Sequence, residues 1–240
     1  MRYSIMWIMV FMRLFSSPLE AQDHLVISRA QFSSAPGALM GERILKEAYS
    51  RIGRDIKLQK LPSIRAMRYA NEGKMDGTFL RVAGLEQAYP NLFMIPIPVG
   101  YEDVVVYTKE TKFVVDGWQS LSPYTIGLVR GFKLADINTV GMRVERANTF
   151  EQVFLMLDSG RTDVVVELKS KQCLLNNLDV SGIRTLEPPI DRIVLYHYLH
   201  IRHKSIAAEL ETVLTRMERA GELKRIQERA IQDFQESCGQ

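Results

Sequence analysis

Cysteine and histidine are scarce in this sequence, and the common catalytic fingerprints are missing from it. The 240 residues include two cysteines, Cys173 and Cys238, and four histidines. Two cysteines this far apart supply neither a metal cluster nor a redox dithiol motif. The sequence also lacks a Gly-x-Ser-x-Gly elbow, a phosphate-binding Gly-Lys loop and a Gly-x-Gly-x-x-Gly fingerprint. Hydrolase, nucleotide-binding and dinucleotide-binding functions therefore have no anchor here.

Three of the histidines stand close together, at positions 197, 200 and 203. On an extended strand, His197 and His203 share one face, whereas His200 points to the other. That arrangement disfavours a converging metal site. We therefore predict no metal, no cofactor and no catalytic residues, and we do not expect an enzyme.

An excess of charge of one sign is also missing. Lysine and arginine number 31 against 28 acidic residues, for a formal charge of +3. Loss of residues 1–21 would remove Arg2, Arg13 and Glu20 and lower that charge from +3 to +2. A protein so close to neutral has no strong electrostatic attraction for nucleic acid. The apolar fraction of 46% is ordinary for a globular protein.

The chain begins with a short apolar run, from Ile5 to Met12, between Arg2 and Arg13. This run is far shorter than the roughly 20 apolar residues that a membrane-spanning helix needs. Small residues follow it, and the whole segment resembles a secretory signal peptide cut after Ala21. We predict residues 1–21 to be a signal peptide and the mature protein to be periplasmic. A retained amphipathic anchor is the alternative.

In an exported protein the two cysteines could form a disulfide, which would tie the C-terminal end to the second half of the chain. A disulfide requires a specific distance between the two residues, and the sequence does not supply that distance. The other possibility, one buried thiol and one frayed tail, therefore remains open.

A short phrase occurs once in each half of the chain, as Gly73-Lys74-Met75-Asp76 and as Gly160-Arg161-Thr162-Asp163. Each copy follows a helical pattern and precedes an apolar run. The glycine can end the helix in a left-handed conformation, and the aspartate favours a tight turn into the next strand. This duplication predicts two similar α/β lobes, with a groove between them that could hold a ligand.

The helices before the two copies carry clear signals. In the first, Ile64, Met67 and Ala70 recur on one face, which predicts that this face is buried. In the second, Thr149 and Gln152 have the spacing of a capping box. Strands and helices alternate along the first part of the chain, and this alternation predicts a mostly parallel sheet with helices on both faces.

Two strands are expected to connect the lobes. The Pro-punctuated segment 89–100 is neither a helix nor a central strand, and the strand that follows, 101–108, crosses into the second lobe. Pro188 and Pro189 close that lobe, the strand 193–201 returns, and one long helical region from 205 to about 234 ends the chain. We predict lobe one over 22–103 and 191–240, and lobe two over 104–190.

The order of these motifs resembles the family 3 extracellular solute-binding proteins, the type associated with amino-acid ABC importers. The resemblance rests on these segments: Pro62-x-x-Arg65-Ala66, Gly73-x-x-Asp76-Gly77, Tyr89-Pro90-Asn91-Leu92, Val99-Gly100-Tyr101, Ile126-Gly127-x-Val129-x-Gly131, Gly160-x-x-Asp163 and Ala220-Gly221-Glu222-Leu223-Lys224-Arg225-Ile226. It implies a two-lobed type II periplasmic-binding fold whose lobes are joined by two crossing strands.

The same resemblance implies a function. We expect a monomer that binds a small polar solute, such as an amino acid, between its lobes and delivers it to an ABC permease. Sensing for a membrane partner is the alternative, and a dehydratase on the same fold is a more remote one. Fold alone does not name a ligand.

The resemblance also implies charged ligand contacts. An arginine of the family lies about ten residues after the Asp-Gly turn and grips the ligand carboxylate, but this neighbourhood has none. Arg81, nearer the turn, is the candidate, and a solvated surface arginine is the alternative. A family acid that meets the ligand ammonium corresponds to Glu167, one position short of the usual offset. An ordinary α-amino acid is therefore not assumed.

Further candidates come from the predicted loops. Backbone N–H groups at Gly131, Phe132 and the Asn148–Thr149 cap could bind an anion at a helix start. Phe32 and Tyr101 could form an aromatic wall, with plain core packing as the alternative. Thr149 is more secure as a helix cap than as a ligand contact.

Overall fold

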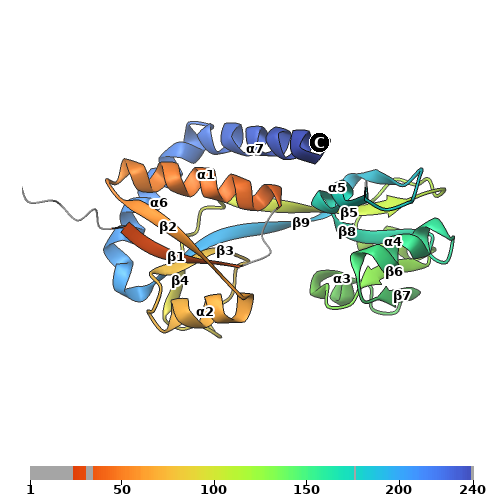
Figure 1. The fold of residues 1–240 in the computed structure, drawn as a ribbon, viewed down its shortest axis with the longest axis horizontal. Coiled ribbons are helices and arrows are strands. Elements are labelled where there is room, and N and C mark those ends of the chain that lie inside the picture. Colours follow the sequence, from red (N-terminus) through yellow and green to blue (C-terminus); the bar gives the residue numbers. More distant parts are fainter. Residues whose placement is uncertain (1–23, 31–34, 176, 239–240) are drawn as a thin grey trace, which may run out of the picture.

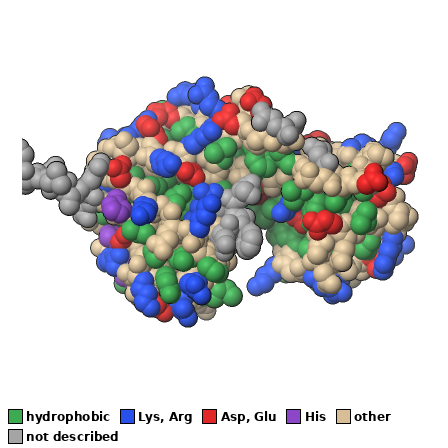
Figure 2. Space-filling model, viewed as in Figure 1, with side chains coloured by type: hydrophobic (Ala, Val, Ile, Leu, Met, Phe, Trp, Pro, Cys, Tyr) green, Lys and Arg blue, Asp and Glu red, His purple; other side chains and the backbone are tan. Residues whose placement is uncertain are grey.

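The computed structural model describes residues 24–30, 35–175 and 177–238. The expected signal peptide and Phe32 lie outside these residues. Within them, no helix is long and apolar enough to cross a membrane. The chain forms two α/β lobes, placed side by side along the long axis of the molecule (Figure 1). Figure 2 shows the larger lobe on the left, the smaller on the right and a gap between them.

Lobe one has the predicted alternation of strands and helices. Strand β1 pairs in parallel with β2 and with β3, and β3 pairs antiparallel with the late strand β9. The short β4 pairs only with β9, as expected for a Pro-punctuated segment that cannot be central. The elements are β1 (His24–Ala30), α1 (Pro36–Arg51), β2 (Asp55–Leu61), α2 (Ser63–Asn71), β3 (Gly77–Arg81), β4 (Leu92–Met94), α6 (Lys204–Arg219) and α7 (Glu222–Cys238).

Two long strands join the lobes, β5 (Gly100–Thr108) and β9 (Arg184–His200). They are antiparallel to each other, and each continues into both lobes (Figure 1). We expected this strand to begin at residue 193, after the two prolines. That prediction was wrong, because β9 begins at Arg184 and includes Pro188 and Pro189. The register between β5 and β9 shifts between Val104 and Val106, and this irregularity accommodates residues that cannot donate ladder hydrogen bonds.

Lobe two is a smaller sheet in which β6 pairs in parallel with β7 and β8, and β8 pairs antiparallel with β5. The strand β7 was not anticipated from the sequence. The elements are the 3-10 turn η1 (Trp118–Leu121), β6 (Ile126–Val129), α3 (Lys133–Asn138), β7 (Val144–Ala147), α4 (Phe150–Asp158), β8 (Val164–Leu168), the 3-10 turn η2 (Lys169–Lys171) and α5 (Gln172–Leu175).

The long helical region expected from 205 to about 234 consists of two helices, α6 and α7. A 3-10 turn, η3 (Ile201–His203), leads from β9 into α6. Gly221, with φ of 69°, separates α6 from α7, because only glycine adopts this left-handed conformation at little cost. The break turns α7 back over α1, so that α1, α6 and α7 share one side of lobe one (Figure 1).

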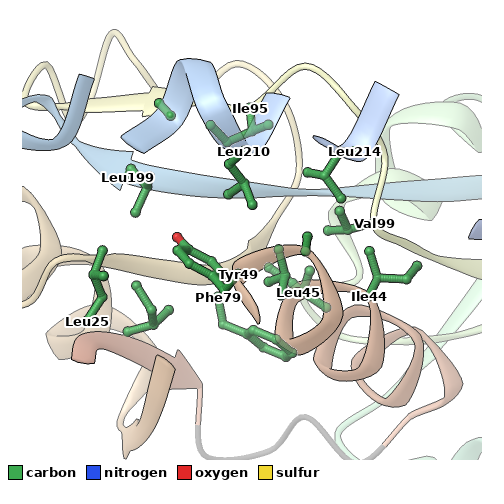
Figure 3. Packing of buried hydrophobic residues seen from close by; sticks show 14 of the residues in the cluster. Leu25, Ile44, Leu45, Tyr49, Phe79, Ile95, Val99, Leu199, Leu210 and Leu214 are labelled. Carbon is green, nitrogen blue, oxygen red and sulfur yellow. The ribbon is translucent and has the colours of Figure 1, made fainter. Parts of the chain in front are cut away.

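The core of lobe one lies between its sheet and these three helices. Figure 3 shows Tyr49 of α1, Phe79 of β3 and Leu199 of β9 meeting Leu210 of α6 there. All four are at most 2% exposed. The Tyr49 hydroxyl lies 2.9 Å from Nε2 of His197, so this buried aromatic ring brings a satisfied polar group into the core.

Lobe two has its own core, in two layers on opposite faces of its sheet. One layer includes Val106, Ile126 and Leu128, and the other includes Tyr107 and Phe154. Neither layer shares a buried residue with the core of lobe one. Because burial of apolar surface is the main favourable term in folding, each core mainly stabilises its own lobe.

The helix α2 does not bury the whole face that its sequence suggested. Met67 and Ala70 are buried, but Ile64 is 84% exposed, so the prediction for Ile64 was wrong. Ile64 lies in the first turn of α2, directly after Pro62 and Ser63. Helical spacing gives the direction of a side chain, but tertiary packing decides whether that side chain is buried.

Candidate functional site

The parallel strands of the two lobes point their carboxyl ends at each other. In lobe one, β3 runs antiparallel to β9, and β1 and β2 run in the same direction as β3, toward lobe two. In lobe two, β8 runs antiparallel to β5, and β6 and β7 run with β8, toward lobe one. Ligands of open α/β sheets bind outside the carboxyl ends of the strands. The gap between the lobes is therefore the candidate site (Figure 2).

Arg81 stands at the carboxyl end of β3, on the lobe-one side of this cleft. Its Nε lies 2.8 Å from Sδ of Met67, and Nη1 donates to the carbonyl of Leu80 at 3.2 Å. Nη2 is buried and has no hydrogen-bond partner within the described residues. Burial lowers the pKa of this guanidinium, and no described carboxylate forms an ion pair with it. Arg81 is therefore not the solvated surface arginine that the sequence left as an alternative.

Lobe two presents loop N–H groups at the end of β6, and most of them are already in use. The N–H of Phe132 donates to the carbonyl of Val129, and the N–H of Lys133 donates to the carbonyl of Gly131. Gly131 itself has φ of 88° and is exposed. The side chain of Phe132 packs against the core of lobe two. These interactions leave little free backbone for an anion at this turn.

The start of α4 is a capping box, as its sequence indicated. The N–H of Gln152 donates to the hydroxyl of Thr149, and the side chain of Gln152 accepts from the N–H of Asn148. The carboxylate of Glu151 accepts from its own N–H and from Thr149, and these contacts lower its pKa. A carboxylate of the chain thus already occupies the positive end of this helix. The secure role of Asn148 and Thr149 is the cap.

Glu167 lies near the carboxyl end of β8 and is 7% exposed. Its Oε1 accepts from the N–H of Leu168 at 2.8 Å. Burial raises the pKa of this carboxyl, although the Leu168 N–H and the charge of Lys171 partly oppose that effect. The side chain is thus largely enclosed in lobe two, next to the cleft-facing end of its strand.

Tyr101 lies on β5 in the connection between the lobes, paired in register with Val194 of β9. The guanidinium of Arg192 stacks 4.0 Å from its ring centroid, and Arg192 also pairs with Asp103 at 2.6 Å. Cation–π contacts of this kind contribute about 0.5–1 kcal/mol at exposed sites. The side chain of Tyr101 is therefore held by Arg192 where β5 and β9 pass between the lobes, a region that we call the hinge. Its role in an aromatic wall of the cleft stays a prediction.

Glu102, next to Tyr101, was not among the candidates predicted from the sequence. Glu102 is 8% exposed, and its Oε1 accepts from the N–H of Gly37, in the first turn of α1, at 2.8 Å. Ser170 of η2 also hydrogen-bonds to it. Glu102 therefore connects both lobes. The available signal was an acidic pair, Glu102-Asp103, at the head of an otherwise apolar crossing strand.

A cavity of about 420 Å³ lies beside this hinge. It is lined by α1, β5, η2, α5 and α7, so both lobes contribute to its wall. Of the candidates that the sequence suggested, Tyr101 contributes to this lining; Arg81, Gly131, Phe132 and Glu167 do not. We call this cavity the hinge pocket. It is separate from the carboxyl ends of β3 and β6.

Cys173 of α5 and Cys238 of α7 form a disulfide, with 5.1 Å between their Cα atoms. Of the two possibilities that the sequence left open, the structure has the disulfide and not two unlinked thiols. The bond joins the last helix, which packs on lobe one, to lobe two. It is a third connection between the lobes, beside β5 and β9.

The histidines do not form a metal site. His197 is buried between Tyr49 and the carbonyls of Thr78 and Phe79, and His203 lies 2.7 Å from Asp76. Among the described residues, no group of three or more His, Cys, Asp or Glu side chains is arranged to hold a metal ion. The expectation that His197 and His203 share one face of a strand was wrong, because β9 ends at His200 and His203 lies in η3.

No known protein family's sequence profile matches this chain. A curated relative from Shewanella oneidensis, an uncharacterized protein, is 25% identical over 207 residues, which cover 81% of this chain and 77% of the relative. Its description carries no function.

Solved structures show the fold. The probable amino-acid ABC transporter extracellular-binding protein ytmK from Bacillus subtilis matches with a TM-score of 0.66 and 11% identity, covering 85% of this chain and 96% of that one. A histidine kinase sensor domain with similarity to periplasmic binding proteins matches with a TM-score of 0.61 and 10% identity, covering 87% and 96%. The chain therefore has the type II periplasmic-binding fold, and its neighbours include both binding proteins and sensor domains.

Proposed function

We propose that this protein, with its type II periplasmic-binding fold, is a non-catalytic periplasmic binder of a small polar solute that carries an anionic group. The solute lies in the cleft between the lobes, which close on it about the strands β5 and β9. The proposed lobes are 22–103 with 191–240, and 104–190. The amino-acid-transporter neighbours support this role, and we propose an ABC permease as the partner of a monomeric protein.

The observation that carries the proposal is the guanidinium of Arg81, whose Nη2 has no hydrogen-bond partner among the described residues and which no described carboxylate neutralises. A buried cation is normally paired, and an unsatisfied buried donor costs free energy. Arg81 stands at the cleft-facing end of β3 with Nη2 buried and without a partner in the described residues. A carboxylate of the solute would supply the missing acceptor, and the planar guanidinium suits bidentate contact with it.

Lobe two contributes in a different way. Because most of its loop N–H groups are bonded within the chain and Glu151 and Gln152 cap the start of α4, Gly131, Phe132, Asn148 and Thr149 are proposed to shape the wall of the cleft. Glu167 would accept a hydrogen bond from a donor group of the solute only if lobe two moves closer to lobe one. We therefore expect the solute to dock first on lobe one.

A thermal-shift screen over amino acids, small organic acids and polyamines tests this function. A solute at about a hundred times its dissociation constant adds roughly 2.7 kcal/mol of stability, a rise in melting temperature of roughly 5 to 10 °C for a chain of this size. The acids and amino acids are expected to give such a shift, and the polyamines are not.

Variants of the candidate arginine then locate the site. Arg81→Ala and Arg81→Lys should each weaken binding of the solute found by at least tenfold, because neither offers the planar pair of donors. Arg68→Ala is the matched control, since Arg68 is an exposed arginine of the same lobe. Unchanged affinity in both Arg81 variants would remove Arg81 from the site.

A second candidate function is ligand sensing, favoured by the disulfide between Cys173 and Cys238. Because α7 is bonded to lobe two, closure of the lobes would also displace the end of α7. Such a displacement could be read by a membrane partner. If no solute shifts the melting curve while a protein partner binds the open form, sensing replaces transport. Turnover of a bound solute would instead indicate the dehydratase alternative.

A further inference from the structure

We propose that the hinge pocket is a second ligand site, separate from the cleft, and that it takes a small organic cation: a primary amine on an apolar body. The pocket lies where the ends of α1 and α7 meet lobe two, whereas the gap of Figure 2 opens on the side of α2 and α3. This inference does not depend on the cleft function, because Arg81 takes no part in it.

The walls of the hinge pocket suit an apolar body. Its lining includes Ile231 and Phe234 of α7, Met40 of α1, Tyr101 of β5 and the two cysteines of the disulfide. Its volume of about 420 Å³ falls within the range of small-molecule sites, roughly 300–1,000 Å³. Such sites combine an apolar lining with a few polar groups that fix the orientation of the ligand.

The polar group that fixes the class of ligand is the carboxyl of Glu102. Two acids line the pocket, Glu102 and Asp103, and Asp103 is already paired with Arg192. Glu102 is 8% exposed, and its hydrogen bonds come from neutral groups, the N–H of Gly37 and the side chain of Ser170. No described cation forms an ion pair with it. A buried carboxylate without a cation is a costly arrangement.

The surrounding charges agree with this assignment. Burial raises the pKa of Glu102, the Gly37 N–H and Ser170 oppose it, and Asp103 and Lys171 act in opposite directions. Lys169, the lysine in the lining, is engaged at 2.7 Å with Glu187. A ligand ammonium would thus meet an acceptor that no side chain of the described residues neutralises. Gln172 and Gln235 also line the pocket, and their side chains have carbonyl oxygens that can accept hydrogen bonds.

A simpler role for Glu102 is structural. Its carboxylate accepts a hydrogen bond in the first turn of α1, where a negative charge is favourable. The variant Glu102→Gln separates the two roles, because an amide oxygen still accepts from Gly37 but carries no charge. A purely structural Glu102 would leave amine binding unchanged in this variant.

The experiment measures binding of tryptamine, benzylamine and hexylamine to the full disulfide-bonded chain by calorimetry. Tryptophol, the neutral alcohol matched to tryptamine, is the ligand control. At least one amine is expected to bind, and tryptophol is expected to bind at least tenfold more weakly than tryptamine. Glu102→Gln should weaken amine binding at least tenfold, and Glu236→Gln, which removes an exposed carboxylate of α7, should not change it.

Two further results complete the test. Phe234→Ala should weaken amine binding, and Arg81→Ala should leave it unchanged, which separates this site from the cleft. The proposal is overturned if no amine binds at millimolar concentration, if Glu102→Gln binds the amines as the parent does, or if Arg81→Ala abolishes binding. Failure of the solute screen for the cleft has no bearing on these outcomes.

Discussion

The two copies of the repeated turn have the same geometry in both lobes. Gly73 and Gly160 have φ of 70° and 73°. Asp76 accepts from the N–H of Val26 at 2.7 Å, and Asp163 accepts from the N–H of Thr125 at the same distance. Each aspartate also donates its own N–H back to the carbonyl of that residue. The repeat therefore fastens a helix-to-strand turn to the neighbouring strand, and it is architecture rather than a ligand contact.

The aspartates of the two copies differ in their other contacts. In lobe one, the carboxylate of Asp76 also contacts Arg202 and His203 of η3, at the start of the C-terminal helices. Burial raises the pKa of Asp76, but the Val26 N–H, Arg202 and His203 outweigh it, so that this pKa is lowered. Asp163 has no ion pair within the described residues. The copy in lobe one thus makes additional contacts, because the segment that leads into the C-terminal helices packs against it.

The largest expected effect concerns the bond between the lobes. Replacing Cys173 and Cys238 by serine should lower the free energy of unfolding by about 4 kcal/mol, as estimated for a loop closed over a separation of 65 residues. Urea unfolding of the variant and of the reduced parent should agree, because both lack the same link. A loss of less than about 1 kcal/mol would mean that the unfolded chain gains little freedom.

The next largest effect is expected from replacing the aspartate in each copy of the repeat. Asp76→Ala should destabilise by about 3 kcal/mol and Asp163→Ala by about 1.5 kcal/mol, because hydrogen bonds to a charged group contribute roughly 1.5–3 kcal/mol and Asp76 makes more of them. Chemical unfolding of both variants measures the difference. Equal losses would show that the contacts of Asp76 with Arg202 and His203 add nothing.

A smaller effect is a difference between the two lobes in how their stability depends on pH. Burial lowers the pKa of His197 in lobe one to about 4, against about 6.5 unfolded, so its contribution is fully present above pH 6.5 and is lost as pH falls toward 4. Glu167 in lobe two has a raised pKa, which adds stability as pH falls. Acid should therefore weaken lobe one relative to lobe two.

The variant His197→Gln isolates the histidine. Between pH 7.5 and pH 5, the stability gap between parent and variant should narrow by about 2 kcal/mol, since the variant has no imidazole to protonate. Unfolding curves at the two pH values measure this gap, and hydrogen exchange shows whether the change lies in lobe one. A gap that stays constant would contradict the assigned burial effect.

Much of the fold was accessible from local sequence signals. The turn glycines, the capping box at Thr149 and the alternation around β1, β2 and β3 depend on neighbours within a few residues. Long-range features were harder to predict. The strand β7 is short and half polar, the break at Gly221 interrupts a continuous helical pattern, and Pro188 sits in a strand because β5 shifts register beside it.

The candidate site divides in the same way. The family resemblance suggested Arg81, although it lies nearer the Asp-Gly turn than the family's arginine, but only the fold shows that its Nη2 is buried without a partner among the described residues. The sequence also suggested free N–H groups at Asn148, while the fold shows that the side chain of Gln152 already binds there. Glu102 was passed over, because its importance depends on α1 and η2, which approach it from both lobes.

By itself, the sequence determined the pieces: two helix-to-strand turns, their caps and an order of strands that requires two lobes. These depend on backbone preferences and on periodicity, which act over a few residues. Only the tertiary structure decided that Cys173 meets Cys238, that Ile64 stays exposed and that Glu102 is enclosed at the hinge. Burial and pairing depend on segments that are distant in the chain, so local preference does not contain them.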